Sequence, residues 1–337
     1  MWPSEASVAR RQNRFPAGPV VCDSGGMPDS EERATERVWR AMPAGSREAL
    51  TRDLPPTDLQ TLLLAVARAR AGQVTPADVM RRWQQDRFVR PAACDPRRTA
   101  ALEARLWQLL PAGFTGIELS PVVPLGTCTA VAPVSENRIV ATIRNTEVVS
   151  DSTNALAVEA ATRRRGQPKE GQVDLAACHR QLRAQVFGPG AGSHFRLFTL
   201  VSSARDSGSG RTEASMLIRH LDYLLEALET LIPHRQPRIE LSVFDNPVLA
   251  ERLADTVRPS FGDRAALLFD QPGRTRGRGY YDGFALRISA DGDVELGDGG
   301  LTTYTAQLTQ DAKERCLVSC IATERLSILT DEEASSA

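Results

Sequence analysis

Apolar residues recur at helical spacing near the start of the chain, and this pattern predicts a small helical subdomain over residues 28–94. A first helix is expected from Asp29 or Ser30 through Trp39. A second begins at Thr57-Asp58, and its apolar face is formed by Leu59, Leu62, Leu63 and Val66. Thr75 followed by Pro76 is typical of an N-cap and a first helical turn, so a third helix should start there.

From residue 95 onward, helical stripes alternate with short β-compatible runs. Helices are expected over residues 95–110, 150–165, 213–231 and 248–257, and strands over 114–119, 138–143, 238–244, 265–269 and 284–288. Strands joined by short turns outnumber strand–helix–strand units. The fold class is therefore expected to be α+β, a mostly antiparallel sheet flanked by helices. Near the end, Cys316 and Cys320 are expected on one face of a helix, and residues 331–337 as a disordered tail.

The chain is organised around residues 173–206, where two β-rich runs flank a loop of glycine and proline at residues 188–192. This arrangement predicts a hairpin, because glycine permits positive φ and proline interrupts strand pairing. Arg183 stands at the loop end of the first strand, with its stem on the sheet and its guanidinium free to meet a phosphate or carboxylate. On this stretch alone, a surface hairpin with an incidental arginine remains the alternative.

Composition excludes several classes of function. The 337 residues carry 41 Lys and Arg against 42 Asp and Glu, so no global basic field is expected to attract nucleic acid. No secretory signal and no apolar run of about 18 residues occurs, which predicts a cytoplasmic protein without membrane contact. The six cysteines form no CxxC pair, so they are expected to be structural thiols, not metal ligands or disulfides. Residues 1–27 have a disordered composition, Met27 is a plausible start, and deleting residues 1–26 should leave the melting temperature unchanged.

Five short motifs between residues 95 and 329 carry the candidate chemistry. They are the helix and strand that end at Pro121, the triplet Asp151-Ser152-Thr153, the triplet Arg183-Ala184-Gln185 with Phe195 ten residues further on, the run Arg276-Gly277-Arg278-Gly279-Tyr280-Tyr281-Asp282-Gly283, and Thr323-Glu324-Arg325-Leu326. Together they resemble the catalytic core of class II aminoacyl-tRNA synthetases. Within that class, the resemblance is to the histidyl-tRNA synthetase branch, which includes the regulatory subunit of ATP phosphoribosyltransferase.

The resemblance implies a role for each of these residues. Arg183 and Arg276 would be catalytic. ATP would be bound, with Mg²⁺, by Arg183, Gln185, His194 and Arg325. The amino acid would be held by Asp151, Thr153, Tyr280 and Tyr281, and no residue is assigned as a protein metal ligand. Motif 1, over residues 95–125, would form a homodimer.

Some positions depart from the family pattern. Gln185 stands where glutamate is expected, and the loop after it lacks the family's further arginines. The family's Gly-Gly-Arg-Tyr-Asp is reduced to Gly299-Gly300 followed by Leu301, and the glycines of motif 3 are replaced. The sequence also ends directly after motif 3, where an anticodon-binding domain would follow. A complete tRNA synthetase is therefore not expected.

Structural alternatives remain open for several candidates. Asp151 and Thr153 would also serve simply to cap the helix that follows. Arg325 would also suit a surface ion pair with Glu324 or Glu314. Tyr280 and Tyr281 are adjacent, so in a strand only one of them would face a ligand. The arginines at 163–165 are expected to be a solvated charge run at a helix end.

Two hypotheses of function follow. The first is an enzyme that binds ATP and a small amino acid or related carboxylate, activates it as an adenylate, and passes it to a carrier or biosynthetic intermediate. The second is a non-catalytic subunit that senses a ligand and regulates a partner enzyme. Arg183, Arg276 and Arg325 favour the first, because a scaffold does not need three converging arginines. The missing loop arginines and glycines favour the second.

Overall fold

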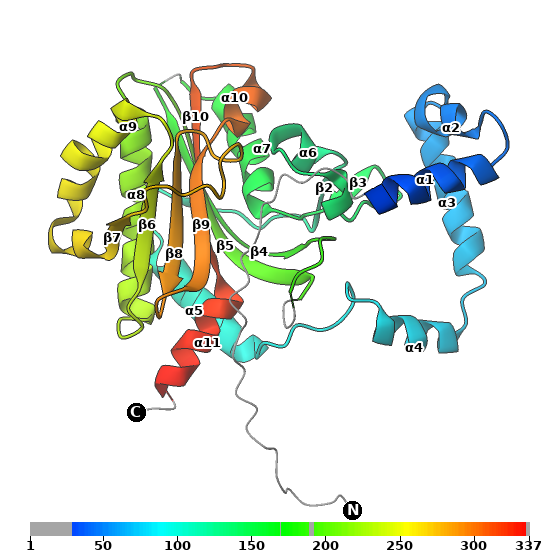
Figure 1. Ribbon diagram of the computed structural model, residues 1–337, viewed down its shortest axis with the longest axis horizontal. Helices are drawn as coiled ribbons and strands as arrows, with labels where there is room; N and C mark the ends of the chain where they lie inside the picture. Colours follow the sequence, from blue (N-terminus) through cyan, green and yellow to red (C-terminus); the bar gives the residue numbers. More distant parts are fainter. Residues whose placement is uncertain (1–28, 169, 189–191, 335–337) are drawn as a thin grey trace, which may run out of the picture.

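An eight-stranded sheet forms the centre of the molecule in the computed structural model, which describes residues 29–168, 170–188 and 192–334 (Figure 1). Its strand order is β1-β4-β5-β10-β9-β8-β6-β7, and β2 and β3 pair separately. Two strand pairs, β1 with β4 and β6 with β7, are parallel, and the others are antiparallel. The strands are β1 (Thr115–Gly116), β2 (Val122–Pro124), β3 (Thr146–Val148), β4 (Gln172–Leu182), β5 (His194–Arg205), β6 (Arg238–Val243), β7 (Leu268–Asp270), β8 (Phe284–Ala290), β9 (Val294–Thr302) and β10 (Glu314–Ala322). The α+β class is confirmed.

Helices cover both faces of this sheet. Those in the described chain are α1 (Asp29–Ala41), α2 (Ser46–Glu48), α3 (Pro56–Ala71), α4 (Pro76–Gln85), α5 (Pro96–Leu109), α6 (Thr127–Val131), α7 (Ser152–Arg165), α8 (Arg211–Leu231), α9 (Pro247–Arg252), α10 (Tyr304–Thr309) and α11 (Thr323–Ala334). One face packs against α5, α8, α9 and α11, and the other against α6, α7 and α10. None of these helices combines the length and apolar character needed to cross a bilayer.

The larger core lies under α8, whose leucine stripe was expected from its spacing. Leu217, Leu221, Leu224, Leu225 and Leu228 are fully buried there. At about 25 cal/mol for each Å² of apolar surface removed from water, such a stripe contributes several kcal/mol. On the opposite face, α7 presents alanines to the sheet, which lets the helix lie close to β4 and β5. The start of α7 is thereby held next to the loop end of β4.

The predicted hairpin is formed by β4 and β5, which pair over their full length. Arg183 N–H donates to Ser193 O at 2.8 Å and extends the pairing by one step towards the loop. Loop residues 189–191 lie outside the described part of the chain. The hairpin places Arg183 at its open end, as its sequence position predicts.

The N-terminal helices α1 to α4 project beside the sheet and form no core of their own (Figure 1). No residue of α2, α3 or α4 is buried, although Met80 and Trp83 are apolar and 59% and 52% exposed. The predicted capped start of α4 is confirmed, since Thr75 accepts from Asp78 N–H and the Asp78 carboxylate accepts from Thr75 N–H. Residues 1–28, on which the start and deletion predictions fall, lie outside the described chain.

Several local predictions were wrong. Residues 138–143 form no strand; Glu136–Arg138 is a 3-10 turn, and the β3 pairing begins at Thr146. Residues 258–267 are 3-10 helical where a strand was expected to begin at 265. Cys316 and Cys320 are buried on strand β10, not on a helix. Helix α11 continues to Ala334, past the boundary expected at residue 331. For the two cysteines, the pairing of β10 with β5 and β9, which are distant in sequence, outweighed local propensity.

Candidate functional site

The candidate site begins where α7 starts beside the end of β4. Asp151 caps α7 by accepting from Thr153 N–H at 2.9 Å and from Thr153 Oγ1 at 2.7 Å. Arg183 donates from Nε to Ser150 O at 2.8 Å, and its Nη2 lies 3.3 Å from the Asp151 carboxylate. The helix-capping role that the sequence left open for Asp151 is therefore present, and the same carboxylate also contacts Arg183.

Tyr280 and Tyr281 complete this part of the site from a turn, not from a strand. Residues 277–281 form that turn, because Tyr281 N–H donates to Gly277 O at 2.8 Å. The two rings meet edge to face at 4.9 Å between centroids, so the expectation of opposite faces was wrong. Tyr280 Oη lies 3.5 Å from Asp151 Oδ2.

Glycine at position 300 permits the Tyr281 ring to lie on the sheet. A Cβ at Gly300 would stand 2.5 Å from the ring and 2.5 Å from Phe284 O, which no side chain tolerates. Gly300 belongs to β9, a strand that the sequence did not predict because its middle is rich in glycine. Close packing therefore explains why glycine stands at both Gly299 and Gly300.

Arg276 is bound by a carboxylate of the chain itself. Its Nη1 and Nη2 atoms lie 2.5 and 2.9 Å from the two carboxylate oxygens of Glu295, and Nη2 lies 4.0 Å from Asp298. Glu295 and Asp298 are three apart, so a regular strand would turn them to opposite faces. A bulge at Leu296 adds one residue to β9 opposite β8 and brings both carboxylates to the same side.

Arg325 reaches the same segment from the first turn of α11. Its Nη1 donates to Glu295 O at 2.9 Å. The ion pairs considered from sequence are not formed, because Glu324 pairs with Arg180 and Glu314 with Arg164. Arg164 is also not solvated, contrary to the expectation for the 163–165 run, since it is buried against Glu314.

Charges link these contacts into one cluster. Burial raises the pKa of the Asp298 carboxyl, with smaller contributions from Glu295 and Asp151, although 24% of the Asp298 side chain is accessible. Burial raises the pKa of the Cys320 thiol, 3.6 Å from Asp298, and Arg183 opposes that shift. Arg183 and Asp151 therefore lie close enough to Asp298 and Cys320, which neighbour Arg276, to influence the pKa of these groups.

Arg274 belongs to this cluster and was missed from sequence. Its side chain is 8% exposed, its Nε donates to Arg276 O at 2.9 Å, and its buried Nη1 has no hydrogen-bond partner in the described chain. Burial lowers the pKa of its guanidinium, while Asp298, Tyr281 and Glu295 oppose that shift. Its position two residues before Arg276 was the available signal. For Glu295 and Asp298, the only signal in the sequence was that they lie close to Gly299 and Gly300.

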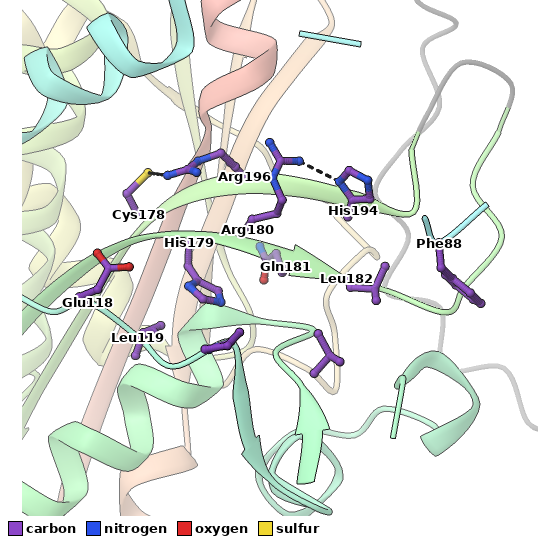
Figure 2. Close-up of a pocket in the computed structure, with 12 residues that line it drawn as sticks. Phe88, Glu118, Leu119, Cys178, His179, Arg180, Gln181, Leu182, His194 and Arg196 are labelled. Atoms are coloured by element: carbon purple, nitrogen blue, oxygen red, sulfur yellow. Dashed lines mark hydrogen bonds between the residues drawn. The ribbon is translucent and has the colours of Figure 1, made fainter. Parts of the chain in front are cut away.

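Two predicted residues lie apart from the cluster. His194 accepts from Arg180 at Nδ1 at 2.8 Å and donates from Nε2 to Arg90 O at 2.6 Å. Its side chain lines a separate pocket at the edge of the sheet, shown in Figure 2. Gln185 accepts at its main-chain oxygen from Arg87 at 2.8 Å. The structure therefore gives no support for His194 as a neighbour of Arg183.

The charged residues of this cluster partly suit the binding of a nucleotide together with a metal ion. Arg183, Arg274, Arg276 and Arg325 supply four positive charges against the three carboxylates of Asp151, Glu295 and Asp298, which leaves a small positive excess for phosphate. Mg²⁺ in nucleotide sites is held by one or two carboxylates together with phosphate oxygens. Asp298, which has no ion pair closer than 4.0 Å among the described residues, is the carboxylate best placed for this.

Comparison with known proteins shows where this fold recurs. No family model and no curated protein matches the chain in sequence. Among solved structures, it is similar to apo histidyl-tRNA synthetase from S. aureus, with a TM-score of 0.56, 13% identity, and coverage of 72% of this chain and 69% of that one. The chain has the class II synthetase fold.

Two further structures of this fold agree. An ATP phosphoribosyltransferase regulatory subunit/histidyl-tRNA synthetase from Bacillus halodurans gives a TM-score of 0.56 at 11% identity, covering 72% of this chain and 83% of that one. A histidine–tRNA ligase subunit from Alicyclobacillus acidocaldarius gives 0.54 at 15% identity, covering 73% and 98%. The resemblance to the histidyl branch of class II synthetases, stated from short motifs, therefore holds for the fold of the core.

Proposed function

We propose that this protein binds ATP and a small amino acid or related carboxylate and activates the carboxylate as an adenylate. The observation that carries the proposal is the meeting of Asp151, Arg183 and Tyr280, which come from three distant segments, on the sheet face of a fold whose enzymes are ATP-dependent ligases. A complete tRNA synthetase is not proposed.

The residues divide the work of adenylation. The substrate carboxylate attacks the α-phosphorus, a new P–O bond forms, and the bond to pyrophosphate breaks. Arg183 offsets the charge that builds up at phosphorus, and Arg325 contacts the outer phosphates. Asp151 holds the ammonium group of an amino acid, with Tyr280 beside it, while Thr153 fixes the rotamer of Asp151. Asp298, together with the phosphates, would hold Mg²⁺, which would supply further positive charge at the leaving group.

A non-catalytic, ligand-sensing subunit of a partner enzyme is the second candidate. It is favoured by the pairing of Arg276 with Glu295, because a guanidinium held by an internal carboxylate must release it before meeting a substrate. One of the similar structures carries the name of a regulatory subunit. Under this reading Asp151 and Tyr280 still bind an amino acid, and Arg276 is structural.

A pyrophosphate-exchange assay across the amino acids and common small carboxylates separates the two. Incorporation of labelled pyrophosphate into ATP that depends on one acid supports adenylation. Thermal stabilisation by an acid without any exchange supports the sensing role, since a ligand that binds only the folded state raises the melting temperature. If no acid produces exchange or stabilisation, the site is not a carboxylate site and both readings fail.

A further inference from the structure

Helices α1 to α4, which together we call the arm, expose apolar side chains that have no cover. Met80 and Trp83 are three positions apart and Val79 and Trp83 four, so these side chains share one face of α4. They are between 52% and 59% exposed. Most of the large apolar side chains exposed in the described chain belong to the arm and the residues next to it: Val38, Met42, Leu62, Leu63, Val66, Val79, Met80, Trp83 and Val89. Exposed apolar surface gathered in one part of a protein marks an interaction site.

Polar contacts join the arm and the segment after it to the core of the same chain. Gln60 Oε1 accepts from Asn145 Nδ2 at 3.3 Å, and Arg87 Nη1 donates to Gln185 O at 2.8 Å and to Ser193 Oγ at 2.9 Å. These contacts leave the apolar face of α4 exposed. A helix shorter than about 12–15 residues is marginal in water unless it packs against something. The arm therefore needs a cover that is present whenever the chain is folded.

A second copy of the chain is the cover that the position of the arm favours. Residues 86–95 lead from α4 directly into α5, where the segment 95–125 begins. This inference rests on the expectation that residues 95–125 form the twofold contact of a homodimer, because a segment that borders such a contact lies close to the other protomer. A second copy is also available wherever the protein folds, unlike an occasional partner.

The core exposes apolar side chains on the same side as the arm. Leu125 follows β2, Ile143 precedes β3 and Val186 lies in the hairpin loop, and they are 50%, 41% and 81% exposed. Figure 1 shows the β2–β3 pair between the sheet and the arm. Elsewhere in the described core, the large apolar residues that are comparably exposed are Val248 and Phe269. The side of the core near β2 and β3 is therefore the apolar surface that an arm from a second copy would cover.

Charge favours contact of the arm with this part of the core over contact between two arms. Arg68, Arg70 and Arg82 are exposed and form no ion pair among the described residues. Two arms packed against each other would bring these like charges together, which is unfavourable. Glu118 and Glu136, on the chain that leads into and out of β2, are exposed acids that also lack an ion pair within the described residues. The arm and this side of the core are therefore complementary in charge.

We propose that the arm of one protomer packs on the core of a second copy, and that the second arm does the same in return. The apolar face of α4 lies on the exposed side chains around Ile143 and Val186 of the other copy. The arginines of the arm face the acids at 118 and 136 of that copy. Because each arm contacts the other core, the contact is made twice and association ends at the dimer.

Photo-cross-linking of the full chain tests this contact. Benzoylphenylalanine in place of Met80 reacts under ultraviolet light with the C–H bonds next to it. We expect a product of twice the chain mass on a denaturing gel, and mass spectrometry should locate the second attachment point close to Ile143 or Val186. The same probe in place of Val248 on α9 is the matched control, since Val248 is also apolar and 45% exposed, and it should give no such product.

Met80→Glu and Trp83→Glu test the contribution of the apolar face. Each variant places a charge inside the proposed contact, and it should raise the dimer dissociation constant in sedimentation measurements by about tenfold, because a few apolar anchors dominate such interfaces. Val248→Glu should leave the constant unchanged. All three variants should fold, as checked by circular dichroism, since the replaced side chains are 59%, 52% and 45% exposed.

The outcomes separate this proposal from the expected homodimer. A dimer by light scattering that gives no cross-link from position 80 would overturn the arm contact and leave the homodimer in place, and the arm would then be open to a different protein. A monomer would overturn both. A cross-link from position 80 to the second arm, or a ladder of products of higher mass, would overturn the reciprocal contact with the core.

Discussion

Arg183 Nη2 lies 3.3 Å from the carboxylate of Asp151, a residue 32 positions earlier in the chain. The guanidinium is held in place by Ser150 O through Nε, so its remaining donors are directed rather than mobile. Such an arginine suits a charge that appears only in the transition state.

Replacing Arg183 with alanine should therefore lower turnover in pyrophosphate exchange by roughly two to three orders of magnitude. Folding should survive, as checked by circular dichroism, because the side chain lies outside both apolar cores. Arg235→Ala is the matched control: it removes a half-buried arginine paired with Asp291 and should leave exchange unchanged. Equal rates for the two variants would remove Arg183 from the catalytic assignment.

Arg325→Ala should act on ATP binding. Its contact with outer phosphates would exist in the ground state as well, so we expect the KM for ATP to rise about tenfold with little change in kcat. Exchange rates measured over a range of ATP concentrations give both constants. A fall in kcat at unchanged KM would instead assign Arg325 to the transition state.

The protein is expected to be a homodimer, since residues 95–125 resemble the motif that forms the twofold contact in class II synthetases. Light scattering at micromolar concentration measures the mass directly. A mass near 36.7 kDa, that of one chain, would count heavily against this prediction.

Arg164 and Glu314 should be important for stability and not for activity. Their side chains are 3% and 6% exposed, and two N–O contacts of 2.9 and 3.0 Å join them. Arg164→Ala leaves Glu314 buried without its counter-charge and should cost about 3–5 kcal/mol in denaturant unfolding. Arg163→Ala breaks only an exposed pair with Glu159 and should cost about 0.5 kcal/mol or less. Similar losses for the two variants would refute this contrast.

His220 should make stability depend on pH. It is buried between Ser202 and Ser319, 2.9 Å from each hydroxyl, and burial lowers its pKa from 6.5 to about 3, with Arg219 adding to the shift. Because the unfolded chain binds the proton first, this contribution is complete above pH 6.5 and is lost as the pH falls towards 3. The slope is up to about 1.4 kcal/mol per pH unit. His220→Gln should flatten the profile, whereas the exposed His234→Gln should not.

The sequence by itself determined the features that depend on neighbouring residues. Thr75 and Asp151 cap α4 and α7 as expected, because a cap joins a side chain to a main-chain amide two or three residues away. The leucine period fixed the buried face of α8, and the glycine-rich loop marked the β4–β5 hairpin. The order of the motifs also indicated the class II fold, which the comparison of structures bears out.

Only the tertiary structure decided which charges meet. Glu295 binds Arg276 because a bulge in β9 turns the Glu295 side chain towards the site. No local sequence pattern predicts a bulge inside a glycine-rich strand. Arg164 is buried because Glu314 comes to it from 150 residues away. His194 faces away from Arg183 because side chains alternate across β5, and Arg90 comes from another segment to bind it. These pairings depend on strand register and on segments distant in sequence, which local propensity does not encode.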